Sequence, residues 1–171
     1  MSENQIVNRV SQSSLVTLNL EDYYHPGPRV VYDLKEHLFQ GLILREKDFR
    51  DSLKQEDWSK YKDQNVAVIC SADAIIPQWA YMLIAVHLEP YANMVVFGDL
   101  QALEQTLFQK ALASIDLDLF KDAKIVIKGC GEIPIPEFAY VEISRLLRPV
   151  AASIMYGEPC STVPIYRKSR K

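Results

Sequence analysis

The chain has 171 residues, of which 49% are hydrophobic and 24% charged, and its net charge at pH 7 is −3. This composition predicts a soluble globular protein, and the charge argues against nucleic acid or an anionic membrane as a partner. The longest apolar run, residues 79–86, is too short to span a bilayer, and residues 1–14 carry no signal-peptide core, so a cytoplasmic location is expected.

The first third of the chain predicts an N-terminal extension of short β and α elements. Apolar and polar residues alternate over residues 15–20, which is typical of an edge strand. Two prolines and a glycine predict a loop over residues 21–29. A short strand is expected at residues 30–32, and the helical pieces expected after it are residues 33–39, 46–54 and 56–62.

The middle and the end of the chain repeat each other. Residues 61–99 can be laid over residues 120–158 without a gap, at a spacing of 59 residues, and 11 of the 39 paired positions are identical. Ordinary composition would give about two identities by chance. A repeat at this spacing predicts a duplicated structural unit.

Each copy of the repeat predicts the order strand, loop, helix, strand. The apolar runs at residues 65–69 and 124–128 are rich in β-branched side chains and predict strands that are covered on both faces. Closing strands are expected at residues 94–98 and 153–157. A strand joined to the next through a helix predicts a parallel crossover unit.

Prolines mark the two helices of the repeat. Ile-Pro pairs at residues 76–77 and 135–136 predict helix starts, because proline is tolerated in the first turn. A further proline two residues after Leu88 and after Leu147 predicts that the helices end near these leucines. The first helix is apolar on nearly all sides, so we expect it to be deeply buried.

The segment between the two copies predicts one more helix. Residues 100–113 are amphipathic, Asp99 is a plausible N-cap, and residues 114–119 read as a connector. No linker rich in glycine, serine or proline divides the chain, so a single domain is expected over residues 1–171. The predicted fold is α/β, with a mainly parallel sheet built from the two repeated β-loop-α-β units and the N-terminal β/α extension.

Thiols and carboxyl groups follow the predicted strand ends. The thiols are Cys70, Cys130 and Cys160, and the carboxyl groups are Asp73, Asp99, Glu132 and Glu158. Because parallel strands end at one edge of a sheet, these loops are expected to gather there. Thiolates are ligands for zinc and iron–sulfur clusters, so the sequence predicts a metal site of three cysteines, with Asp73 or Glu132 as a fourth ligand.

Two other readings of the cysteines stay open. Free cysteine is among the most buried residue types, so all three could be core residues of a non-catalytic interaction module. One thiol could instead be the nucleophile of a small-molecule enzyme. A Cys–His pair would favour the enzyme, but His25, His37 and His87 are poorly placed for it. The reaction, the cofactor and the substrate are left open by the sequence.

Three segments resemble an uncharacterised bacterial domain-of-unknown-function family. They are residues 70–77, 128–136 and 157–166, and the similarity covers nearly the whole chain. Members of that family are often encoded beside genes of the sulfur-mobilisation system for iron–sulfur assembly. The resemblance therefore implies an accessory role there, with iron–sulfur assembly proteins as partners. The resemblance implies no particular activity. The sequence is also compatible with a homo-oligomer.

Overall fold

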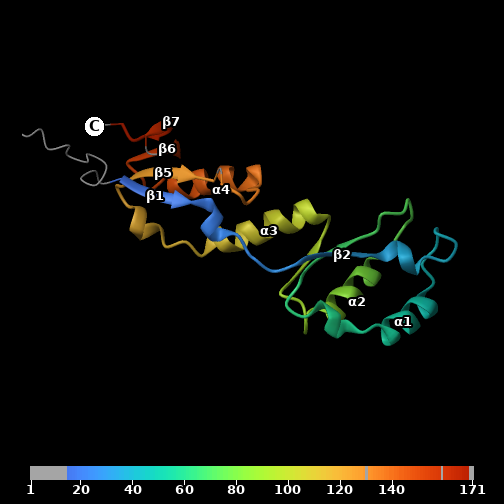
Figure 1. Cartoon of the computed structure of the whole chain (residues 1–171). Coiled ribbons are helices and arrows are strands. Elements are labelled where there is room, and N and C mark those ends of the chain that lie inside the picture. Colours follow the sequence, from blue (N-terminus) through green and yellow to red (C-terminus); the bar gives the residue numbers. More distant parts are fainter. Residues whose placement is uncertain (1–14, 130, 159, 170–171) are drawn as a thin grey trace, which may run out of the picture. The chain divides into compact units, whose positions relative to one another are not determined.

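A computed structural model describes residues 15–129, 131–158 and 160–169. The chain divides into two compact units, which we describe separately. Unit 2 is His25–Leu107, and unit 1 is the described part of residues 1–24 and 108–171. Helices alternate with mostly parallel strands in the described residues, which confirms the predicted α/β class (Figure 1). That the chain is one domain stays a prediction.

Unit 2 is built on a three-stranded parallel sheet. Its strands are β2 (Arg29–Asp33), β3 (Asn65–Ile69) and β4 (Met94–Phe97), in the order β2-β3-β4. The connection from β2 to β3 contains the 3-10 helices η2 (Leu34–His37) and η3 (Trp58–Tyr61) and the helix α1 (Glu46–Gln55), and α2 (Gln78–Leu88) links β3 to β4. The main core of the unit packs α1 and α2 against the strands.

Unit 1 is built on a four-stranded sheet. Its strands are β1 (Leu15–Asn19), β5 (Lys124–Lys128), β6 (Ser153–Glu158) and β7 (Ser161–Arg167), in the order β1-β5-β6-β7. Among the described strands of this sheet, only β7 is antiparallel to its neighbour. The helices of the unit are α4 (Glu137–Leu147), which links β5 to β6, and the 3-10 helices η1 (Leu20–Tyr23) and η4 (Leu117–Phe120).

The helix α3 (Leu100–Ala113) contributes to the core of both units. Its first half packs Leu103 and Leu107 on Ala67 of unit 2, and its second half places Phe108 and Leu112 in the core of unit 1. The predicted cap is confirmed, because Asp99 Oδ1 accepts a hydrogen bond from the Ala102 N–H at 2.9 Å.

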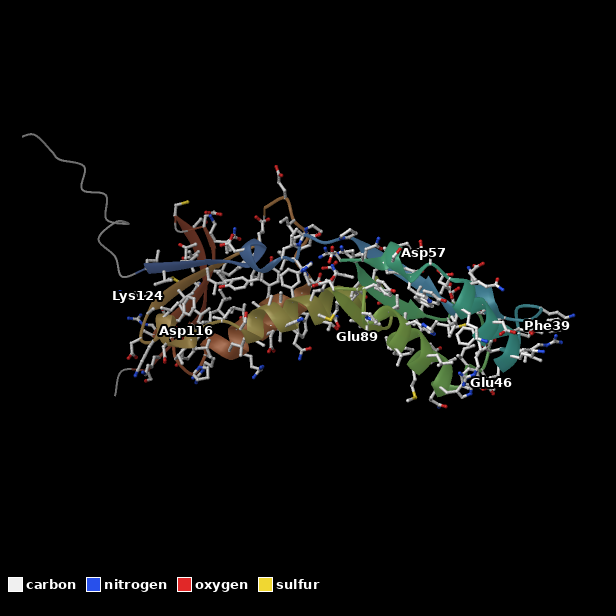
Figure 2. The ribbon with its side chains drawn as sticks, turned by 90° about the horizontal axis from the view of Figure 1, so that it is seen from below. Phe39, Glu46, Asp57, Glu89, Asp116 and Lys124 are labelled. Atoms are coloured by element: carbon white, nitrogen blue, oxygen red, sulfur yellow. The ribbon has the colours of Figure 1, made fainter. Side chains whose placement is uncertain are left out.

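Elements within and immediately before the two predicted copies have matching bounds. The pairs β3 and β5, α2 and α4, and η3 and η4 all begin and end at positions 59 residues apart. Asp57 and Asp116, both labelled in Figure 2, are the N-caps of η3 and η4, and each carboxylate accepts from the N–H two residues later. A common origin of the two segments stays a prediction.

Two expectations about burial and pairing are wrong. The strands of the described residues form two sheets, not one, because the N-terminal strands β1 and β2 pair with different copies of the repeat. The helix α2 is not buried all round, since Met82 and Val86 are 66% and 70% exposed. Its fully buried residues are Ala80, Ile84 and Leu88, and the partly buried Trp79, Tyr81 and Leu83 pack against the same core. In the residues the structure describes, no helix is long and apolar enough to cross a membrane.

Candidate functional site

The predicted thiol and carboxyl residues that the structure describes follow strands of two different sheets. Cys70 and the exposed Asp73 follow β3 in unit 2, whereas the exposed Glu132 and Cys160 belong to unit 1. Cys130 lies outside the described residues. No three of the described His, Cys, Asp and Glu residues are grouped closely enough to hold a metal ion. Because the strands form two sheets, the expected rim of a single sheet does not exist, and the metal site itself stays a prediction.

The surroundings of Cys70 are those of a structural cysteine. Its side chain is half-buried against the core of unit 2, and its thiol lies 3.8 Å from the Ala72 carbonyl oxygen. The loop is anchored by Asp33, whose carboxylate accepts from the Ser71 N–H at 3.0 Å and from Ser71 Oγ at 2.6 Å. Burial raises the pKa of Asp33, but these hydrogen bonds outweigh it and hold the pKa below its usual value.

Two of the other predicted acids also have structural partners. Asp99 caps α3, and Glu158 forms an ion pair with Lys128 at 2.7 Å. Neither acid was among the predicted metal ligands. Both roles follow from the position of each acid beside a helix start or a neighbouring strand.

Glu21 anchors the loop that follows β5. Its carboxylate accepts from the Ile133 N–H at 3.1 Å, and a Cβ at Gly131 would overlap it. The same loop is tied to α4, because Tyr140 Oη donates to the Gly129 carbonyl oxygen at 2.8 Å. A side chain at position 131 would therefore require the Glu21 carboxylate to move, a packing relation that the sequence does not reveal.

Unit 1 contains an apolar pocket of about 360 Å³ between its sheet and α4. Its lining residues are Ile127, Tyr140, Ser144, Tyr156 and Ile165. The rings of Tyr140 and Tyr156 meet edge to face, with centroids 5.7 Å apart. Ser144 Oγ donates to the Tyr140 carbonyl oxygen at 2.7 Å. Sequence reasoning missed this pocket, because one of its walls is β7, which was not predicted.

Unit 2 contains a polar cavity of about 470 Å³ along the strand β2. Its lining residues are Val31, Tyr32, Asp33, Lys35, Glu36, His37, Glu56, Lys60 and Tyr61. Glu56 and Lys60 form an ion pair, which raises the pKa of Lys60. The cavity thus carries charges of both signs on a wall made by one edge strand and two 3-10 helices.

A partly buried hydrogen-bond chain begins at the cavity wall. Tyr32 Oη lies 2.8 Å from His37 Nε2, and His37 Nδ1 lies 3.0 Å from Ser52 Oγ. Ser52 donates its own proton to the Phe49 carbonyl oxygen, so it accepts from Nδ1, and Nε2 accepts from the tyrosine. Both ring nitrogens of a neutral His37 are then satisfied.

Burial also shifts the two titratable groups of this chain. It lowers the pKa of His37 below 6.5, although Glu56 and Glu36 oppose the shift, and it raises the pKa of Tyr32. The sequence could not have linked these residues, because Tyr32, His37 and Ser52 come from a strand, a 3-10 helix and an α-helix at spacings that form no motif.

We expect His37 to make the protein less stable in mild acid. Its folded-state pKa lies below its unfolded value, so the stability that neutral His37 provides is complete above pH about 6.5 and is lost as pH falls towards the folded pKa. Urea unfolding between pH about 7.5 and about 5.5 should show the free energy of unfolding decreasing in the wild type. The variant His37→Asn should lose much of this slope, and an unchanged slope would contradict the assignment.

One of the comparisons with known proteins gives a match. A family model described as a protein of unknown function (DUF2480) matches residues 4–168. No curated protein and no solved structure matches the chain. The family match carries no activity, cofactor or partner, so the link to iron–sulfur assembly stays a prediction.

Proposed function

Because the chain belongs to DUF2480, a family of unknown function, we propose from the structure of unit 1 that this protein is a non-catalytic module that binds a small apolar ligand. The observation that carries the proposal is the pocket between the sheet and α4. Its volume of about 360 Å³ lies in the range of known small-molecule sites.

The position of the pocket supports this proposal. Ile127 and Tyr156 come from the later parts of the parallel strands β5 and β6, next to the loops that follow them. Open α/β sheets bind their ligands outside the carboxyl ends of the strands. A ligand in this pocket would therefore lie near that edge of the unit 1 sheet.

The lining residues favour binding over catalysis. They are two isoleucines, two tyrosines and a serine, with no thiol, carboxylate or imidazole among the described lining residues. Such a lining offers apolar contact and aromatic faces. It offers neither a metal-ligand set nor a pair of acid and base groups.

Ser144 indicates what polar group the ligand would carry. Its hydroxyl proton is donated to the Tyr140 carbonyl oxygen, so Ser144 Oγ offers an acceptor oxygen to the pocket. A flat apolar molecule with one N–H or O–H donor would therefore match the pocket better than one without. Indole has this chemistry and serves as a probe.

Filling the pocket should weaken the binding of indole. Ile165 lines the pocket, whereas Val163 is an exposed residue of the same strand that does not. We expect Ile165→Trp to weaken indole binding at least about tenfold in ligand-observed NMR titrations and Val163→Trp to leave it unchanged. 1-Methylindole, which lacks the N–H donor, should bind the wild type more weakly than indole.

Three results would overturn the proposal. They are no saturable binding of indole to the wild type, equal binding by the two folded tryptophan variants, and tighter binding of 1-methylindole than of indole. Circular dichroism of both variants shows whether they fold.

Metal analysis separates this proposal from the thiolate hypothesis. An apolar-ligand module should bind indole equally well in the wild type and in Cys130→Ser and Cys160→Ser variants. Zinc or iron that purifies with the protein under anaerobic conditions and is lost in Cys130→Ser would favour the metal site and an accessory role in iron–sulfur assembly.

A further inference from the structure

The polar cavity of unit 2 lies on an open edge of the sheet. β2 is at the end of the order β2-β3-β4, so among the described strands only β3 pairs with it. The Asn65 N–H donates to the Pro28 carbonyl oxygen at 2.8 Å, which sets the hydrogen-bonding row of β2. In a parallel pair alternate residues bond to the neighbour, so Val30 and Tyr32 face β3, and the N–H and C=O of Val31 face the open edge.

We propose that this cavity binds a short zwitterionic peptide, which extends along β2 and pairs with the backbone of Val31. Val31 lines the cavity and is 40% exposed. The backbone of a peptide offers a C=O to the Val31 N–H and an N–H to the Val31 C=O. Adding a strand to an open sheet edge is a common mode of peptide recognition. This inference concerns a different unit and a different ligand from the apolar pocket.

The charges of the cavity fit the two ends of such a ligand. Lys35 would lie near a carboxylate and Glu36 near an ammonium group, beside the Glu56–Lys60 ion pair. Lys35 is only loosely held, because its Nζ is 3.9 Å from Asp33 and its side chain is 50% exposed. Tyr61 also lines the cavity and adds a neutral polar group to the same wall.

The part of the cavity wall that Tyr32 forms is ordered without a ligand. Tyr32 is 5% exposed, and its hydroxyl is fixed by the His37–Ser52 chain. Its ring stacks on that of Trp58, with centroids 5.8 Å apart, and the Trp58 N–H donates to the Leu53 carbonyl oxygen at 2.9 Å. A site that is already ordered loses little conformational entropy on binding.

Proline substitution tests the strand pairing directly. Val31→Pro removes the N–H that faces the open edge and leaves the bonds between β2 and β3 in place, so the variant should fold. Thr17 holds the corresponding position on the edge strand β1, where it pairs with Val126 as Val31 pairs with Ala67. Thr17→Pro is therefore the matched control.

The probe is the dipeptide dialanine, followed by NMR chemical shifts of the full chain. We expect saturable binding to the wild type and to Thr17→Pro, and binding about five- to tenfold weaker to Val31→Pro. N-acetyl-dialanine and dialanine amide, each of which lacks one charge, should both bind more weakly than dialanine. The proposal is overturned if dialanine does not saturate, if Val31→Pro binds as well as Thr17→Pro, or if a blocked peptide binds as tightly as the free one.

Discussion

Replacing Ile143 by alanine should lower the free energy of unfolding by about 2–5 kcal/mol. Ile143 lies in the middle of α4 with none of its surface exposed, in the core formed with β5 and the second half of α3. Removing three carbon atoms from this position loses apolar contact and leaves a cavity, and both effects destabilise the folded state.

The same substitution at Ile84 tests whether unit 2 depends on its core to the same extent. Ile84 holds the matching position of α2 and is also fully buried, so Ile84→Ala should cost about the same. Val141, which is 70% exposed on α4, provides the control, and Val141→Ala should change the stability by less than about 0.5 kcal/mol. Urea unfolding measures all three, and equal effects at Ile143 and Val141 would contradict the described packing of α4.

Gly157→Ala should destabilise unit 1 by at least about 2 kcal/mol. Gly157 lies in β6 with φ of +120°, a conformation that residues with a side chain rarely adopt. A Cβ there would also lie 2.6 Å from the Ser161 carbonyl oxygen across the β6–β7 hairpin. Since the obstacle is backbone, relief would require the two strands to move apart.

A substitution at Gly41 separates the effect of backbone strain from the effect of a steric clash. Its φ is +71°, but a Cβ there would meet no atom within 4 Å. Gly41→Ala should therefore show only the backbone strain, about 1 kcal/mol. A smaller loss of thermal stability for Gly157→Ala than for Gly41→Ala would show that the hairpin is not packed as described.

Local signals in the sequence identified most elements of the two copies of the repeat. The Ile-Pro pairs and the later prolines placed α2 and α4 within two residues of their ends, because proline acts on the backbone next to it. The runs of β-branched residues gave β3 and β5 with their full length. These signals depend on neighbours in the chain and not on the rest of the fold.

Features that depend on contacts between segments far apart in the sequence could not be predicted from local signals. Nothing local indicates that β1 pairs with β5 and β2 with β3, which is why one sheet was expected. β7 was missed because Pro164 interrupts its pattern, and the structure accommodates that proline on the outermost strand. The pocket and the Tyr32–His37–Ser52 chain were missed for the same reason, since each joins several elements.

The division of the chain has a consequence for its synthesis on the ribosome. Unit 2 is one continuous stretch, His25–Leu107, so all three of its strands have been made before β5 is translated. β1 is made first but finds its partner only about a hundred residues later. We therefore expect unit 2 to fold while the nascent chain is still growing, with β1 waiting unpaired until β5 emerges.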